Sequence, residues 1–109
     1  MAKPSPALPD RAIISALAGT FGANATSAAY PTEPGAVNVT LTGTWSGTVT
    51  LCRSFDGGTT LAPYATPDGT ALSWTAAMST MLPECEAGVL WYLVMSSFAS
   101  GSCAYRISQ

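Results

Sequence analysis

The feature that most constrains the fold is an alternation of apolar and polar residues with a period of two, which begins at Val37. Val37, Val39 and Leu41 alternate with polar residues through position 42. The alternation resumes at Trp45, continues through position 52, and is followed by Asp56-Gly57-Gly58, a sequence typical of a hairpin turn. A period of two places successive side chains on opposite faces of a strand. The segment therefore predicts two β-strands and the turn into a third.

The rest of the C-terminal part repeats this pattern. We expect an edge strand over residues 60–65, because Pro63 cannot donate a hydrogen bond within a sheet. Further strands are expected near residues 72–76, 89–98 and 103–108, and residues 77–88 are expected to form a connection with one helical turn before Pro83. The strand over 89–98 is apolar on both faces, which predicts either a central position or burial at an interface as well as in the core. About six short strands separated by turns predict an all-β chain that folds as a single antiparallel β-sandwich, Ig-like or jelly-roll-like.

The N-terminal third has a different character. Three prolines within the first nine residues exclude a helix there, whereas Asp10 and Gly19 have the properties of helix caps and predict a short helix between them. We divide the chain into an N-terminal arm, residues 1–36, and a β-sandwich domain, residues 37–109, that holds its core without help. The arm is expected to be ordered by contact with its own sandwich or with a neighbouring subunit. The residues predicted to form a capsid or subunit interface are Ile13, Ile14, Leu17, Phe21 and Tyr30.

The composition argues against several classes of function. Only 9% of the residues are charged, there is no histidine, and the four basic residues are scattered, so we expect no nucleic-acid partner. No apolar run approaches the roughly 20 residues that cross a membrane. Without histidine the usual catalytic base and the commonest metal ligand are missing. We expect no enzyme activity, catalytic residue, cofactor or metal site, although a cation at Glu84 and Glu86 is an alternative to a solvated loop.

The cysteines bear on the compartment in which the protein is made. Cys52, Cys85 and Cys103 form no CxxC pair, and the first residues lack the apolar core of a signal peptide. An odd number of cysteines under these conditions favours reduced thiols and synthesis in a cytosol. A bridge between Cys52 and Cys103 stays open as an alternative.

The hairpin turn itself carries a local motif. Residues 54–60, SFDGGTT, resemble the Asp-box turn of sialidase propellers, Ser-x-Asp-x-Gly-x-Thr-Trp. The final tryptophan is absent and the motif occurs once, so the resemblance implies a hairpin whose aspartate accepts backbone hydrogen bonds rather than a glycosidase. Trp45 and Trp74 are predicted to lie in the core, and stacking on a sugar is the alternative.

A wider resemblance covers residues 37–109. The segment GTWSGTVTLCRSFDGGTT, a DGT turn, a strand with the sequence EAGVLWY and a closing strand AYRIS are similar to small virion structural proteins of tailed bacteriophages. The resemblance implies a head decoration (cement) protein on the capsid surface, made in the host cytoplasm. Its implied partners are the major capsid protein and copies of itself, with a trimer among the alternatives, and neither nucleic acid nor membrane. A tail or neck component and a carbohydrate-binding adhesion module are the alternative functions.

Overall fold

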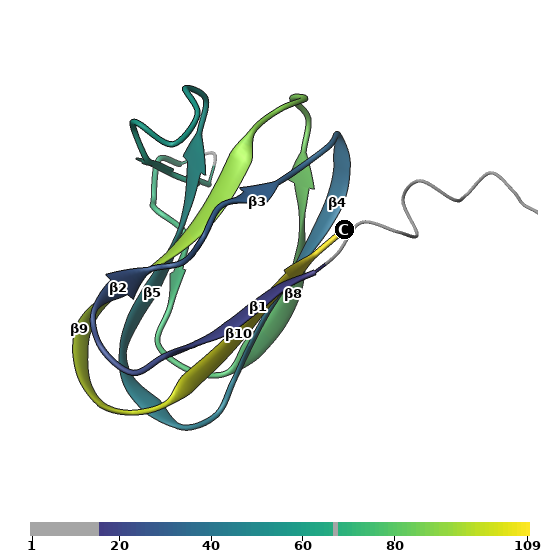
Figure 1. The fold of residues 1–109 in the computed structure, drawn as a ribbon. Coiled ribbons are helices and arrows are strands. Elements are labelled where there is room, and N and C mark those ends of the chain that lie inside the picture. Colours follow the sequence, from purple (N-terminus) through teal and green to yellow (C-terminus); the bar gives the residue numbers. More distant parts are fainter. Residues whose placement is uncertain (1–15, 67) are drawn as a thin grey trace, which may run out of the picture.

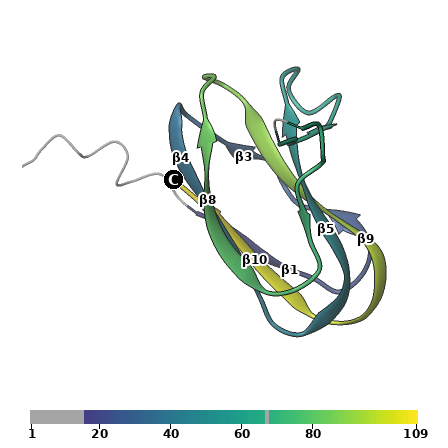
Figure 2. The same cartoon turned by 180° about the vertical axis from the view of Figure 1, so that it is seen from behind.

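A computed structural model describes residues 16–66 and 68–109 and shows two antiparallel sheets packed face to face (Figures 1 and 2). The described residues contain no helix. Their strands in chain order are β1 (Leu17–Phe21), β2 (Ala25–Thr26), β3 (Tyr30–Pro31), β4 (Gly35–Thr42), β5 (Trp45–Ser54), β6 (Ala62–Pro63), β7 (Ser73–Trp74), β8 (Met78–Glu84), β9 (Leu90–Gly101) and β10 (Cys103–Ser108). The all-β sandwich predicted from the sequence is confirmed.

Strands that are neighbours in a sheet are mostly far apart in the sequence. The first sheet has the order β1-β10-β4-β8, and the second has the order β2-β9-β5-β6, with β3 also paired to β9 and β7 to β5. The long strand β9 lies between β5 and the short strands β2 and β3, so its predicted central position is confirmed. The short β6, which contains Pro63, lies at an edge of the second sheet as predicted.

The core lies between the sheets and is built by every second residue of the long strands. The inner face of β4 contributes Val37, Val39 and Leu41, each at most 1% exposed, as the alternation predicted. Trp45 is also buried in this core, and Trp74 is half-buried against it. Among the further buried side chains are Val49, Leu51, Trp91, Leu93, Met95, Cys103 and Ile107. All three cysteines are free thiols, so the structure contains no disulfide bridge.

The prediction of a helix between Asp10 and Gly19 is wrong where the structure describes it. Residues 17–21 form β1, which pairs with β10 from Leu17 opposite Ile107 onward. The part over residues 10–15 lies outside the described residues. A two-turn helix is marginal in isolation, whereas pairing with β10 gives this segment a ladder of hydrogen bonds along one edge. Gly19, read as a helix stop, instead leaves room for the ring of Tyr105.

The described part of the predicted arm packs on its own sandwich. Its strands β1, β2 and β3 pair with β10 and β9, and Phe21 and Tyr30 are each 3% exposed within the core. Strand β4 begins at Gly35, two residues before the predicted start of the sandwich domain. Residues 37–109 therefore do not supply the whole core, because Phe21 and Tyr30 fill part of it.

The prediction of a connection with a helical turn over residues 77–88 is wrong for its first half. Residues 78–84 form β8, which pairs with β4 along its whole length. Met78, Thr80 and Leu82 are half-buried and alternate with exposed residues, which is the pattern of a strand with one covered face. Pro83 is tolerated because β8 is the edge strand of the first sheet.

Candidate functional site

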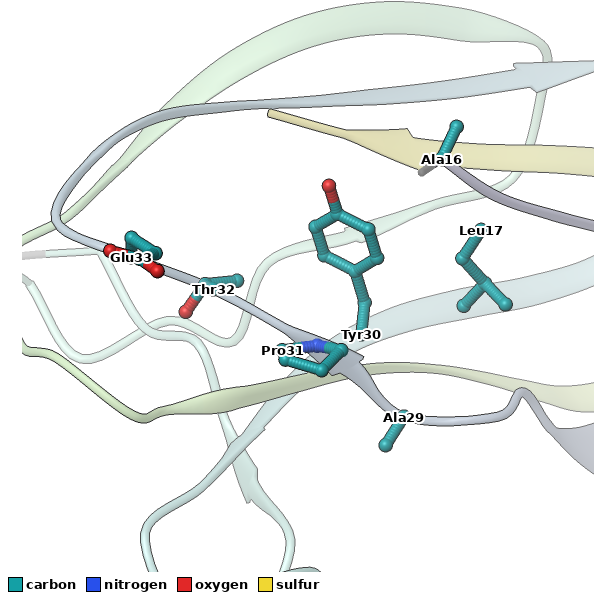
Figure 3. Close-up of a pocket in the computed structure, with 7 residues that line it drawn as sticks. All are labelled: Ala16, Leu17, Ala29, Tyr30, Pro31, Thr32 and Glu33. Carbon is teal, nitrogen blue, oxygen red and sulfur yellow. The ribbon is translucent and has the colours of Figure 1, made fainter. Parts of the chain in front are cut away.

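A groove of about 410 Å³ opens on one side of the sandwich, between the start of β1 and the segment that contains β3 (Figure 3). Most of its lining is apolar, and the apolar part ends at a carboxylate. The lining residues are Ala16, Leu17, Ala29, Tyr30, Pro31, Thr32 and Glu33. The groove adjoins the point where residues 1–15 join the described chain, because Ala16 is the first described residue and forms part of its wall.

The local sequence explains why the sandwich is open here. Strand β3 is only two residues long, and beyond Pro31, which lies opposite Leu90, its contact with the segment of β9 continues as hydrogen bonds between Thr32 and Val89. On the opposite wall, β1 is the edge strand of the first sheet and pairs with β10. Because Ala16 and Ala29 have small side chains, the space between the two edges is not filled by the described residues.

One end of the groove is held by hydrogen bonds between distant parts of the chain. The backbone N–H and the hydroxyl of Thr32 both donate to the carbonyl of Val89, at 3.0 and 2.7 Å. The backbone N–H of Glu33 donates to Oε1 of Gln109 at 2.9 Å, and Nε2 of Gln109 donates back to the carbonyl of Glu33. These contacts fix the backbone at Glu33 without using its side chain. The carboxylate of Glu33 therefore lies on a rigid support beside the apolar lining.

The structure brings together some of the predicted interface residues. Leu17 and Tyr30 both line the groove, whereas Phe21 is buried in the core against Tyr105, with ring centroids 4.7 Å apart. Ile13 and Ile14 lie outside the described residues. The groove residues Ala29, Pro31 and Glu33 were not predicted, because nothing in the local sequence indicates that β1 lies opposite them.

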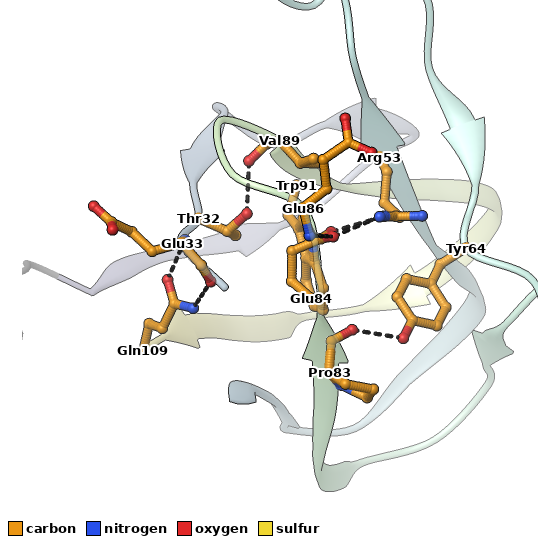
Figure 4. A network of polar contacts seen from close by, with 10 residues as sticks. All are labelled: Thr32, Glu33, Arg53, Tyr64, Pro83, Glu84, Glu86, Val89, Trp91 and Gln109. Carbon is orange, nitrogen blue, oxygen red and sulfur yellow. Dashed lines mark hydrogen bonds and ion pairs between the residues drawn. The ribbon is translucent and has the colours of Figure 1, made fainter. Parts of the chain in front are cut away.

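A second cluster of side chains surrounds Glu84 at the end of β8 (Figure 4). The carboxylate of Glu84 is fully buried and accepts two hydrogen bonds from Arg53, from Nε at 2.8 Å and from Nη2 at 2.5 Å. It also accepts the indole N–H of Trp91 at 2.8 Å and the backbone N–H of Glu86 at 3.0 Å. Beside it, the hydroxyl of Tyr64 donates to the carbonyl of Pro83 at 2.8 Å. The cluster thus joins both sheets and the loop after β8.

The electrostatics of this Glu84 cluster favour the ionised pair. Burial by itself raises the pKa of Glu84, but the hydrogen bonds from Arg53, Trp91 and the Glu86 N–H outweigh it, so the pKa lies below its usual value. The hydrogen bond with Glu84 in turn raises the pKa of Arg53. The guanidinium of Arg53 also lies 4.8 Å from the ring centre of Phe55 and 5.5 Å from that of Tyr64. These contacts hold the charge of Arg53 in place.

The Glu84 cluster has the character of a structural tie rather than a reaction centre. Both oxygens of Glu84 already accept hydrogen bonds, so this carboxylate is not open to a cation beside Glu86. The described residues contain no group of three cysteine, aspartate or glutamate side chains arranged to hold a metal ion. Burial raises the pKa of the Cys52 and Cys103 thiols, which makes both weak nucleophiles.

The turn after β5 has the hydrogen bonds that its Asp-box resemblance implied. The hydroxyl of Ser54 donates to Oδ1 of Asp56 at 2.8 Å and accepts the N–H of Gly58 at 2.8 Å. Oδ1 of Asp56 also accepts the N–H of Thr60 at 2.9 Å. That backbone hydrogen bond, followed by the one from Ser54, lowers the pKa of Asp56. The predicted role of Asp56 as a backbone acceptor in a hairpin turn is confirmed.

Comparisons with protein-family models, with curated proteins and with solved structures found no match to this chain. No helix long and apolar enough to cross a membrane occurs within residues 16–66 and 68–109.

Proposed function

We propose that this chain is a structural protein of a tailed-bacteriophage particle, a head decoration (cement) protein that binds the assembled capsid and stabilises it. The observation that carries the proposal is the largely apolar groove beside the junction with residues 1–15, a segment that contains Ile13 and Ile14. A rigid sandwich with a docking groove next to an apolar segment provides a means of attachment. The resemblance of residues 37–109 to phage virion proteins supplies the kind of particle.

The distribution of charge supports attachment by apolar contact. Charged residues make up 9% of the chain, against about 25% in ordinary soluble domains. Strand β9 carries half-buried Leu90, Tyr92 and Val94 on the face that points away from the core. Burial of apolar surface is insensitive to ionic strength, whereas pairing of exposed charges is screened by salt. We therefore infer that attachment depends weakly on salt.

Stabilisation of the particle follows from mass action. A subunit that binds only the intact shell lowers the free energy of that shell by an amount that grows with its concentration relative to its Kd. No catalytic group is needed for this mechanism, which uses only binding surfaces. The Glu84 cluster supports such a surface because it ties the loop after β8 to both sheets.

The test compares particles stripped of the protein with particles to which it has been added back. We expect stripped particles to release DNA at a lower temperature, and re-addition to restore the original release temperature at both low and physiological salt. The matched control is the chain lacking residues 1–14, which retains β1 but not the apolar segment. Equal release temperatures with and without the full-length protein would refute the cement function. Restoration only at low salt would refute the apolar attachment.

The location in the virion is tested separately by imaging. Density at symmetry-related positions on the capsid would support the head assignment, and density confined to the tail or neck would replace it with the tail alternative. The adhesion alternative rested on tryptophans able to stack on sugars and on the Asp-box-like turn. Trp45 and Trp91 are buried in the core, Trp74 is half-buried against it, and Asp56 accepts a backbone hydrogen bond within the turn, so these features give the adhesion alternative little support.

A further inference from the structure

We propose that the groove between β1 and β3 receives residues 11–14 of a second copy of this chain, with Ile13 or Ile14 in its apolar part and Arg11 at Glu33. The inference builds on the proposed function in that both assign binding to this groove. The inference goes further because it names what occupies the groove. It concerns the purified protein in the absence of any particle.

The chemistry of the groove matches that of the segment. The side chains of Leu17, Tyr30 and Pro31 give it an apolar lining, and the carboxylate of Glu33 stands at one end. The sequence Arg11-Ala12-Ile13-Ile14 offers two large apolar side chains and, two to three residues away, one guanidinium. In an extended chain that separation spans roughly 7–10 Å. A single segment of this composition can therefore satisfy the apolar part and the carboxylate together.

The charges of the two parts are complementary as well. Lys3 and Arg11 against Asp10 give the side chains of residues 1–15 a net charge of +1. The two arginines and five carboxylates of residues 16–109 give the sandwich a net charge of −3. Attraction between segment and sandwich is therefore favoured over attraction between two sandwiches.

The chain's own segment is poorly placed to fill the groove. Ala16 is itself part of the wall, and only Ser15 separates it from Ile14. To enter its own groove the chain would have to reverse direction at once, and a reversal takes about four residues, most often with Gly, Pro, Asn, Asp or Ser among them. Residues 11–16, RAIISA, contain only Ser15 of these, and a turn there would use up the isoleucines themselves.

The pairing register of β1 also favours a second copy over the chain's own segment as the occupant of the groove. Leu17 lies opposite Ile107, and strand β10 ends at Ser108, so within the described residues this ladder offers at most one further pair before Leu17. The described part of the first sheet therefore contains no partner strand for the segment that precedes Ala16. A second copy that presents the same segment at the groove has no such restriction. Insertion of one copy into the next is a heterologous contact, which closes into a ring when the rotation between copies permits.

The first experiment asks whether the contact is between chains. A photoreactive benzoylphenylalanine replaces Ile13, and ¹⁴N-labelled and ¹⁵N-labelled protein are mixed and irradiated. We expect cross-links from position 13 to peptides that contain residues 29–33. Cross-links that join a ¹⁴N-labelled peptide to a ¹⁵N-labelled peptide should occur about as often as random mixing of the two proteins predicts. Cross-links found only within one isotope would overturn the inference in favour of the chain's own segment. Absence of any cross-link to residues 29–33 would overturn it altogether.

The second experiment measures self-association by sedimentation equilibrium. Ile13→Asp/Ile14→Asp should weaken it at least tenfold, because each buried isoleucine contributes substantially to binding. Arg11→Glu and Glu33→Arg should each weaken it about two- to fivefold, as expected for one partly exposed ion pair, and the double exchange should restore it. Lys3→Glu is the matched control. It should not weaken self-association in a way that Glu33→Arg restores. A protein that is monomeric at all concentrations would overturn the inference, as would failure of the double exchange.

The two proposals fail in distinguishable ways. Loss of mixed cross-links in the purified protein removes the second copy as the occupant and leaves the particle test unaffected. Loss of particle stabilisation removes the cement function and leaves self-association standing.

Discussion

Replacing Arg53 with methionine should destabilise the protein because it leaves the carboxylate of Glu84 buried without its countercharge. Methionine keeps the apolar stem beside Phe55 and Tyr64, so the change acts mainly on charge. Breaking a fully buried ion pair from one side costs about 3–5 kcal/mol. The side chain of Arg53 is 26% exposed and Glu84 keeps the N–H donors of Trp91 and Glu86, so we expect a smaller loss of about 2–3 kcal/mol at pH 7.

Urea denaturation followed by tryptophan fluorescence, with linear extrapolation, measures this free energy of unfolding. The double variant Arg53→Met/Glu84→Gln removes the buried charge and should recover at least about 1 kcal/mol. Arg106→Met, at an exposed position of β10, is the control and should stay within about 0.5 kcal/mol of the parent.

The pH dependence provides a further check on the same reasoning. Without Arg53, burial raises the pKa of Glu84 above its unfolded value, so the variant loses stability as the pH rises through that range. The difference between parent and variant should therefore shrink between pH 7 and pH 4. A loss below about 0.5 kcal/mol at pH 7, or a difference that does not depend on pH, would show that the pair does not hold this end of the sandwich.

Three further changes test other parts of the structure. The pKa values of Glu84 and Asp56 are lowered by folding, so stability measured by urea denaturation should be constant between about pH 5 and pH 8. It should fall as the pH drops below their unfolded values of 4.5 and 3.8, and a rise in stability there would contradict the assignment. Gly57→Ala should lower the free energy of unfolding by about 1 kcal/mol, because φ at this position is +76°. Gly58→Ala should lower it by more, because φ is +100° and the added Cβ would lie 2.5 Å from the Tyr92 hydroxyl. Equal losses in the two variants would exclude that contact. In thermal melts followed by circular dichroism, deletion of residues 1–14 should leave the transition in place, whereas deletion of residues 1–30 should abolish it or cost more than about 3 kcal/mol, because Phe21 and Tyr30 leave the core.

The strands that the sequence predicted are those with strong local signals. Val37, Val39 and Leu41 alternate with polar residues, and both this strand and its inward face were predicted correctly. The turn at residues 56–58 was predicted from glycines that the structure places at positive φ. In these segments local preference and tertiary pairing agree, so reading the residues one strand at a time is sufficient.

The strands that were missed depend on partners that are distant in the sequence. Leu17 and Gly19 belong to an edge strand because β10, some ninety positions away, pairs with them, and their local sequence is equally compatible with a short helix. Strand β8 was not predicted because it contains Pro83, a residue that an edge strand tolerates. The burial of Glu84 was missed for the same reason, since its partners Arg53 and Trp91 come from the other sheet.

The groove is the clearest example of a site that sequence patterns cannot show. Its two walls come from segments around Leu17 and Tyr30 that belong to different sheets. The described pairing of β1 begins at Leu17, and Ile13 and Ile14 precede it in the sequence. A groove with an apolar lining beside a segment that contains two large apolar side chains suits burial between molecules, and for that reason we propose a binding function at this junction.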